Sequence, residues 1–239
     1  MRVLALDTST RRGSVALLED GVIRVERPGD PSRPPAERLP ADWAAALVTA
    51  DLTPRDIDLF AVASGPGSFT GLRIGIAAMQ GLAVVTRRPM VAVSRLEALA
   101  HVAAEGEPPG TLVAGWMDAH RHDVFSALYV VGSAPPFSLA RLRELEPALV
   151  APPAQIVEMW QRLRRGPAVV AGDGATAYAD LLDRDVRIID PPLLAGAVAR
   201  LAWAYAQAGH AGHPSRVQPL YVRRPDAEVA RERQRHGHG

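Results

Sequence analysis

Residues 65–73 read Gly-Pro-Gly-Ser-Phe-Thr-Gly-Leu-Arg, which places three glycines and one proline in a run of nine. The apolar segment before this run, residues 58–64, is typical of a buried strand, and the apolar residues of 70–87 recur at helical spacing. The residues that share one face of this predicted helix are Leu72, Ile76, Met79 and Ala83. The run therefore predicts a strand, a backbone-lined turn and a helix.

The glycines of this turn do not form either of two common phosphate-binding motifs. A Walker A motif needs a Lys near its end, and this chain contains no Lys. Gly65, Gly67 and Gly71 are spaced G-x-G-x-x-x-G, whereas the dinucleotide fingerprint is G-x-G-x-x-G. N–H groups at a helix start favour an anion or the acceptors of a partner. The residues alone leave two alternatives open, an anion site and a structural turn.

The composition restricts the class of protein. The chain has 239 residues, 48% of them hydrophobic, and a formal net charge of +1, so it can bury the core of one large or two small globular domains. It has no Cys, which excludes disulfides and thiolate metal sites and fits a cytoplasmic protein. No segment is typical of a signal peptide or reaches the ~20 apolar residues of a membrane span. A mild pI near 8.3 and 5% aromatic residues do not predict nucleic-acid binding.

Alternating strand and helix patterns predict an α/β fold in two lobes. The predicted strands are residues 2–6, 14–18, 22–26, 58–64, 90–93, 111–117, 124–131 and 168–171. The predicted helices are 36–50, 70–87, a Ser94-capped helix to about 104, 153–164, a short one at 172–175, and 193–208. The segment between 131 and 153 is expected to be loose, because it combines prolines with charged residues.

The breaker at 106–110 predicts the domain boundary. We expect an N-terminal lobe over 1–107 and a C-terminal lobe over 108–224, with the helix at 193–209 packing back on the first lobe. Residues 225–239 are rich in charge, His and Gly and are expected to be disordered.

Several segments resemble, in order, the signature segments of the TsaB (YeaZ) family. The segments are 6–10 (Leu-Asp-Thr-Ser-Thr), 65–75, 93–100 (Val-Ser-Arg-Leu-Glu-Ala-Leu-Ala), Asp118-Ala119, 172–175 (Gly-Asp-Gly-Ala) and 219–223 (Pro-Leu-Tyr-Val-Arg). The match spans nearly the whole chain, and the run that begins at Gly65 is the most specific of these segments.

The resemblance implies a two-lobed actin-like/Hsp70-like (ASKHA) ATPase fold with mixed sheets flanked by helices. It also implies a non-catalytic partner subunit of the TsaB–TsaD–TsaE machinery, which forms threonylcarbamoyladenosine in tRNAs that read codons beginning with A. The expected partners are a TsaD-type protein in a heterodimer and a TsaE-type ATPase, with a homodimer when the chain is alone. Contact with tRNA is expected only through the complex, and no membrane or cofactor is expected.

A lost active site is also expected from the residues. A TsaD-like metal centre needs two histidines about one helical turn apart, and the chain contains no His-x-x-x-His. The segment 34–40 lacks even the single His that relatives carry before a Leu-Pro pair. We therefore predict no catalytic residue and no metal ligand. Under the resemblance, a vestigial nucleotide site is expected at Asp7, Thr8, Ser9, Gly172 and Gly174.

If the site is vestigial, the function lies in an interface. Small residues at helical spacing after the glycine-rich turn would let another helix approach closely, beside an apolar stripe and the helix at 36–50. The predicted interface residues are Trp43, Leu47, Gly71, Leu72, Gly75, Ile76, Ala78 and Met79. Burial of this helix inside the chain is the alternative. Two other function classes stay open, a sugar-kinase-like ATPase that depends on Asp7 and a glycoprotease-like metallopeptidase, which the missing histidine pair disfavours.

Overall fold

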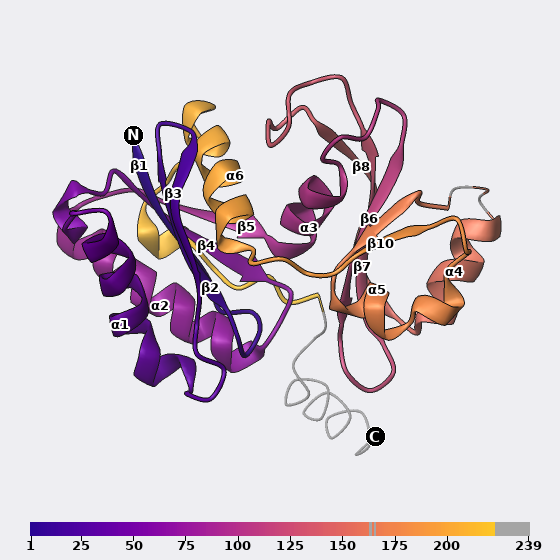
Figure 1. The fold of residues 1–239 in the computed structure, drawn as a ribbon, viewed down its shortest axis with the longest axis horizontal. Coiled ribbons are helices and arrows are strands. Elements are labelled where there is room, and N and C mark those ends of the chain that lie inside the picture. The colour runs from indigo at the N-terminus through magenta and orange to yellow at the C-terminus, as the bar shows by residue number, and fades with distance from the viewer. Residues whose placement is uncertain (163, 165, 223–239) are drawn as a thin grey trace, which may run out of the picture.

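Two five-stranded mixed sheets form the two lobes of this protein (Figure 1). The computed structural model describes residues 1–162, 164 and 166–222, so the predicted disordered tail at 225–239 lies outside the described residues. The first sheet contains β1 (Arg2–Asp7), β2 (Ser14–Glu19), β3 (Val22–Pro28), β4 (Leu59–Gly65) and β5 (Met90–Ser94). The second contains β6 (Leu112–Asp118), β7 (Val124–Val131), β8 (Leu142–Ala151), β9 (Val169–Ala171) and β10 (Arg187–Ile189).

Six α-helices connect and cover these strands in the described part of the chain (Figure 1). They are α1 (Pro35–Thr49), α2 (Phe69–Thr86), α3 (Arg95–Ala103), α4 (Pro153–Arg162), α5 (Asp173–Ala177) and α6 (Ala195–Gln207). Three short 3₁₀ turns, η1 (Pro54–Asp56), η2 (Ala179–Leu181) and η3 (Pro214–Arg216), complete the described elements. The predicted two-lobed fold with mixed sheets flanked by helices is confirmed.

The two sheets repeat one topology. Their strand orders are β3-β2-β1-β4-β5 and β8-β7-β6-β9-β10. In both sheets the first two pairings are antiparallel and the last two are parallel. The central strand β1 of the first sheet therefore corresponds to β6 of the second, and the ends of these two strands occupy equivalent places in the two lobes.

The prediction of a loose segment between 131 and 153 is wrong, because β8 pairs antiparallel with β7 along one edge of the second sheet. Pro147 falls between Glu146 and Leu149, the residues paired with Leu128 and Ser126, where the register shifts. An edge strand tolerates a proline at such an irregularity because no further strand needs its missing N–H. The short edge strand β10 was also not predicted, because three residues are too few to show the apolar pattern of a strand.

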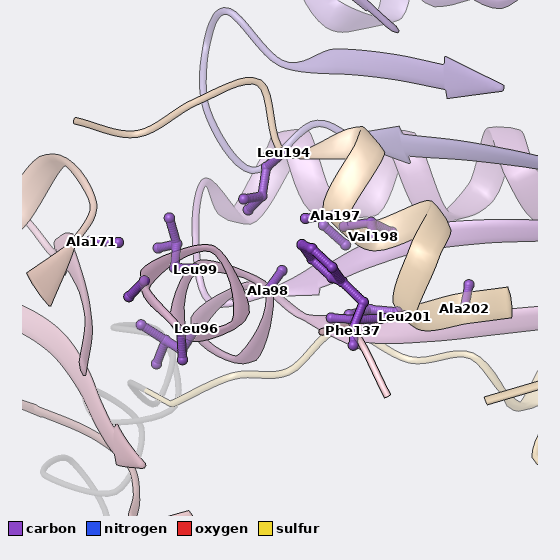
Figure 2. Packing of buried hydrophobic residues seen from close by; sticks show 14 of the residues in the cluster. Leu96, Ala98, Leu99, Phe137, Ala171, Leu194, Ala197, Val198, Leu201 and Ala202 are labelled. Atoms are coloured by element: carbon purple, nitrogen blue, oxygen red, sulfur yellow. The ribbon is translucent and has the colours of Figure 1, made fainter. Parts of the chain in front are cut away.

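Helices α3 and α6 each pack mainly on the sheet formed by the other half of the chain. Helix α3 follows the first sheet in sequence but packs on β6, β7 and β9, whereas α6 ends the second half and packs on β1, β2, β4 and β5. Figure 2 shows Leu96, Ala98 and Leu99 of α3 in the same apolar cluster as Val198 and Leu201 of α6. The two sheets therefore share one continuous core.

Side chains of the first sheet cap the start of α6. The hydroxyl of Ser14 accepts hydrogen bonds from the N–H groups of Leu194 (3.3 Å) and Ala195 (3.0 Å). The carboxylate of Glu26 accepts from the N–H of Gly196 at 2.7 Å, and burial raises the pKa of Glu26 above its usual value. Unpaired N–H groups at a helix start need such acceptors, so these contacts fix α6 on the first sheet.

His101 of α3 is buried as a neutral imidazole. Its ring stacks on Phe137 at 5.6 Å, and burial, with a smaller effect from the positive charge of Arg141, lowers its pKa from 6.5 to about 4. The unfolded chain binds a proton at this residue below pH 6.5, whereas the folded chain does so only near pH 4. Folded-state stability should therefore fall as the pH drops through this window.

We expect the contribution of His101 to reduce the free energy of unfolding by roughly 2 kcal/mol between pH 7.5 and 4.5. The His101→Leu variant lacks this contribution. The free energy of unfolding of the variant minus that of the parent should therefore rise by that amount as the pH falls from 7.5 to 4.5. Urea unfolding at several pH values measures the difference between the two proteins. A difference that does not change with pH would contradict the assignment of a buried neutral imidazole.

Candidate functional site

Three buried polar residues, Asp7, Thr8 and Ser9, close strand β1. One carboxylate oxygen of Asp7 accepts hydrogen bonds from the N–H of Ser9 at 2.8 Å and from the Ser9 hydroxyl. The other lies 3.7 Å from the Nε of Arg95, and both side chains of this ion pair are 4% exposed. The negative charge of Asp7 is thus neutralised inside the protein.

The turn after β4 packs directly on this strand end. The N–H of Ser68 donates to the Ser9 carbonyl at 2.8 Å, and the Ser68 hydroxyl caps α2 by accepting from the N–H of Gly71 at 3.2 Å. A Cβ at Gly71 would lie 2.2 Å from the carbonyl oxygen of Thr8, so the two backbones are in close contact. These two N–H groups of the turn are used within the chain. The geometry favours the structural alternative over an anion site.

The predicted residues of the second lobe form a separate cluster. A Cβ at Gly172 would lie 1.9 Å from the Trp116 carbonyl oxygen, and one at Gly174 would lie 2.8 Å from the carbonyl carbon of Met117. Both glycines therefore pack against the end of β6, the strand equivalent to β1. The five residues predicted for a vestigial nucleotide site thus fall in different lobes: Asp7, Thr8 and Ser9 end β1, whereas Gly172 and Gly174 follow β9 and pack on the end of β6.

Sequence reasoning missed two buried arginines at this site. Arg95 neutralises Asp7, and Arg38 of α1 donates to the carbonyls of Arg11 (3.3 Å) and Arg12 (2.8 Å) in the loop after β1. Arg38 also pairs with Asp42 and is 2% exposed. No sequence signal identifies either contact, because the partners are distant along the chain. Within the described ranges there is no group of three or more His, Cys, Asp or Glu side chains that could hold a metal ion.

The structure places most of the predicted interface residues inside the chain. The residues of that set that are buried within the chain are Leu47, Gly71, Leu72, Gly75, Ile76 and Met79. A Cβ at Gly75 would lie 2.1 Å from the Oγ1 of Thr8, so this glycine admits the end of β1 and not another molecule. Trp43 and Ala78 are partly buried and pack against the core of the first lobe. The small-residue stripe is real, but it faces inward.

A different side of α2 faces solvent, and we call it the outward face. Its residues are Thr70, Ala77, Gly81, Val84 and Val85, and the exposed Phe69 and Arg73 adjoin them in the first half of the helix. Val84 is 57% exposed and Val85 is 84% exposed, which is unusual for valine. No heavy atom outside the local helix backbone lies within 4 Å of a Cβ built at Gly81. From Ala77 to Val85 this face is apolar and carries small side chains, and none of the described residues packs on Gly81.

Helix α2 is also the one helix of the described residues that is long and apolar enough to cross a membrane by length and composition, although only 33% of it is buried. A single such helix is weak evidence of a span. Here α2 connects β4 to β5, which pair in parallel, and its inner face packs on β4. A helix fixed in this way along a sheet is an element of a folded lobe, so its exposed apolar side requires a different explanation.

Comparison with known proteins identifies the family. A family model described as TsaD, tRNA N6-adenosine threonylcarbamoyltransferase, matches residues 25–134. The tRNA threonylcarbamoyladenosine biosynthesis protein TsaB of Haemophilus influenzae is 30% identical over 226 residues, which cover 93% of this chain and 94% of that protein. The chain belongs to the TsaB family. The TsaB protein of Escherichia coli is 39% identical over 129 residues, 54% of this chain and 55% of that protein.

A solved structure agrees with this assignment. YeaZ from Pseudomonas aeruginosa matches with a TM-score of 0.75 and 30% identity, over 92% of this chain and 99% of that one. This match confirms the predicted TsaB (YeaZ) family, and the sheet topology agrees with the predicted α/β fold of two mixed sheets.

Proposed function

We propose that this chain is the non-catalytic partner subunit of a TsaD-type protein in the formation of threonylcarbamoyladenosine in tRNA. A role in this biosynthesis is the coarser part of the proposal and follows from membership of the TsaB family. The finer part is that the chain works in the cytoplasm through its surface, pairs with TsaD, meets a TsaE-type ATPase, and reaches tRNA only through the complex.

The state of the strand end supports the absence of catalysis. A phosphoryl-transfer site of this fold needs a carboxylate that is free to act on a metal ion and phosphate. Asp7 instead holds Ser9 and the guanidinium of Arg95, and the turn at 65–71 covers the strand end. No observation favours the sugar-kinase-like or the metallopeptidase alternative.

The outward face of α2 is the observation that carries the proposal. Exposed apolar patches on soluble domains mark interaction sites, and small residues such as Ala77 and Gly81 allow a second helix to approach closely. Gly81 is informative because alanine would stabilise an exposed helix position by ~0.5–1 kcal/mol. Keeping a glycine there is consistent with a partner that packs against the backbone. In the absence of TsaD, we propose that two copies pair through this face.

The test compares two valine variants. Val84→Glu introduces a charge on the outward face and should weaken binding to the TsaD-type protein of the same genome by at least about a hundredfold, because the carboxylate would be buried without a partner. Val22→Glu, on the exposed edge strand β3, is the control and should bind like the parent. Isothermal titration calorimetry measures both. Equal binding by the parent and Val84→Glu would contradict the use of this face.

A further inference from the structure

The segment that follows α6 forms a strap across one side of α2. Gly212 makes an antiparallel bridge with Met90, and the Gln80 side chain of α2 donates to the carbonyls of Pro214 (2.9 Å) and Val217 (3.1 Å). The N–H of Leu220 then donates to the Ser64 carbonyl at 2.8 Å. Residues 210–222, which we call the strap, are therefore fixed against the first lobe beside the outward face.

An aromatic cluster joins the strap to the start of α2. The rings of Phe69 and Tyr221 stack at 5.3 Å, the Nε of Arg73 donates to the Tyr221 hydroxyl at 2.8 Å, and the Arg73 guanidinium lies 3.9 Å from the centre of the Phe69 ring. Phe69 is 42% exposed and Tyr221 is 38% exposed, and Leu220 beside them is also exposed. Large aromatic residues and Arg on a surface are typical of the residues that contribute most to binding at protein interfaces.

A pocket of about 240 Å³ lies between the strap and α2. Apolar groups of Ile76, Ala77, Val217 and Pro219 line it, together with the polar ends of Arg73, Gln80 and Gln218 and the ring of Tyr221. None of the described carboxylates forms an ion pair with Arg73. The pocket thus combines an apolar wall with an uncompensated positive charge at its rim.

We propose that this pocket is the anchor point of the TsaD-type partner, which inserts an apolar side chain and pairs a neighbouring carboxylate with Arg73. This inference rests on the proposed function. It names the site that makes binding of the TsaD-type partner specific. Charge complementarity selects the occupant. Neither α2 nor the strap contains an acidic residue, so a second copy that faces this chain through the same elements supplies no carboxylate to Arg73.

The proposal therefore separates two kinds of pairing. The outward face serves both self-association and binding of the partner, whereas the strap pocket favours the partner alone. A partner carboxylate at Arg73 makes the hetero-complex more sensitive to salt than the homodimer, since ion pairs at an interface rim weaken as ionic strength rises.

The experiment uses Arg73→Gln and Tyr221→Ala in the full chain, with Arg24→Gln on the exposed strand β3 as the matched control. Binding to the TsaD-type protein is measured by calorimetry at low and high salt, and self-association by sedimentation. We expect each test variant to weaken partner binding about tenfold, and Arg73→Gln to reduce its salt dependence, with self-association unchanged. Thermal unfolding of both variants verifies that the fold is kept.

The outcomes distinguish the two proposals. If the parent binds and both variants bind equally well, the pocket is not the anchor and only this inference fails. If the parent does not bind the TsaD-type protein, the proposed function and this inference fail together.

Discussion

Gly75→Ala is expected to lower the free energy of unfolding by about 3 kcal/mol or more, although alanine is the better helix former. The added Cβ would lie 2.1 Å from the Oγ1 and 3.0 Å from the Cγ2 of Thr8, which is itself fully buried. The start of α2 is tied to the strand end, because the N–H of Ser68 donates to the Ser9 carbonyl at 2.8 Å and Gly71 packs on the carbonyl of Thr8. Overpacking of this kind is costly in a close-packed core.

Two further substitutions test whether contact with Thr8 causes this loss of stability. Gly81→Ala, in the same helix but at an open position, should instead raise stability by ~0.5–1 kcal/mol. Thr8→Ala in the Gly75→Ala background removes the clashing atoms and should recover about 1–3 kcal/mol in a double-mutant cycle. Urea unfolding of the parent, Gly81→Ala, Gly75→Ala, Thr8→Ala and the double variant gives these values. If Gly75→Ala is as stable as Gly81→Ala, the packing of Thr8 against α2 is incorrect.

Arg95→Met is expected to cost about 3–5 kcal/mol, because it leaves the buried carboxylate of Asp7 without its counter-charge. Chemical denaturation at neutral pH measures the effect. The control is Arg88→Met, which breaks a half-exposed ion pair with Asp58 at 3.8 Å and should cost about 1 kcal/mol or less.

A second substitution tests the cause. Asp7→Asn keeps the shape of the side chain, so in the Arg95→Met background it should restore part of the lost stability by removing the unpaired charge. Similar losses for Arg95→Met and Arg88→Met would mean that Arg95 contributes no more than a surface arginine. The strand end would then not be closed by an internal counter-ion.

The sequence predicted the elements of α2 better than the role of its faces. Periodicity correctly placed Leu72, Ile76 and Met79 on one side, and these residues are buried. It could not show whether Gly71 and Gly75 admit a partner or the chain itself, because a small residue is needed at either kind of close approach. Only the position of Thr8 in three dimensions decides between them.

Long-range contacts account for the rest of what was missed. Arg95 appeared only as one letter of a family segment, and its pairing with Asp7 depends on how α3 is placed after β5. Strand β8 was obscured by Pro147, since a local pattern does not reveal that the strand lies at a sheet edge. The cluster of Phe69, Arg73 and Tyr221 joins a helix start to the strap, which no spacing rule predicts.

The most direct measurement of the central claim is reconstituted modification of an unmodified tRNA transcript by the TsaD-type protein, the TsaE-type ATPase and the synthase of the same genome. We predict that modification requires this chain, that Val22→Glu supports it fully, and that Val84→Glu does not, while the isolated chain hydrolyses no ATP. Modification at the full rate without the chain, or brisk ATP hydrolysis by the chain alone, would contradict a function that lies in its docking surface.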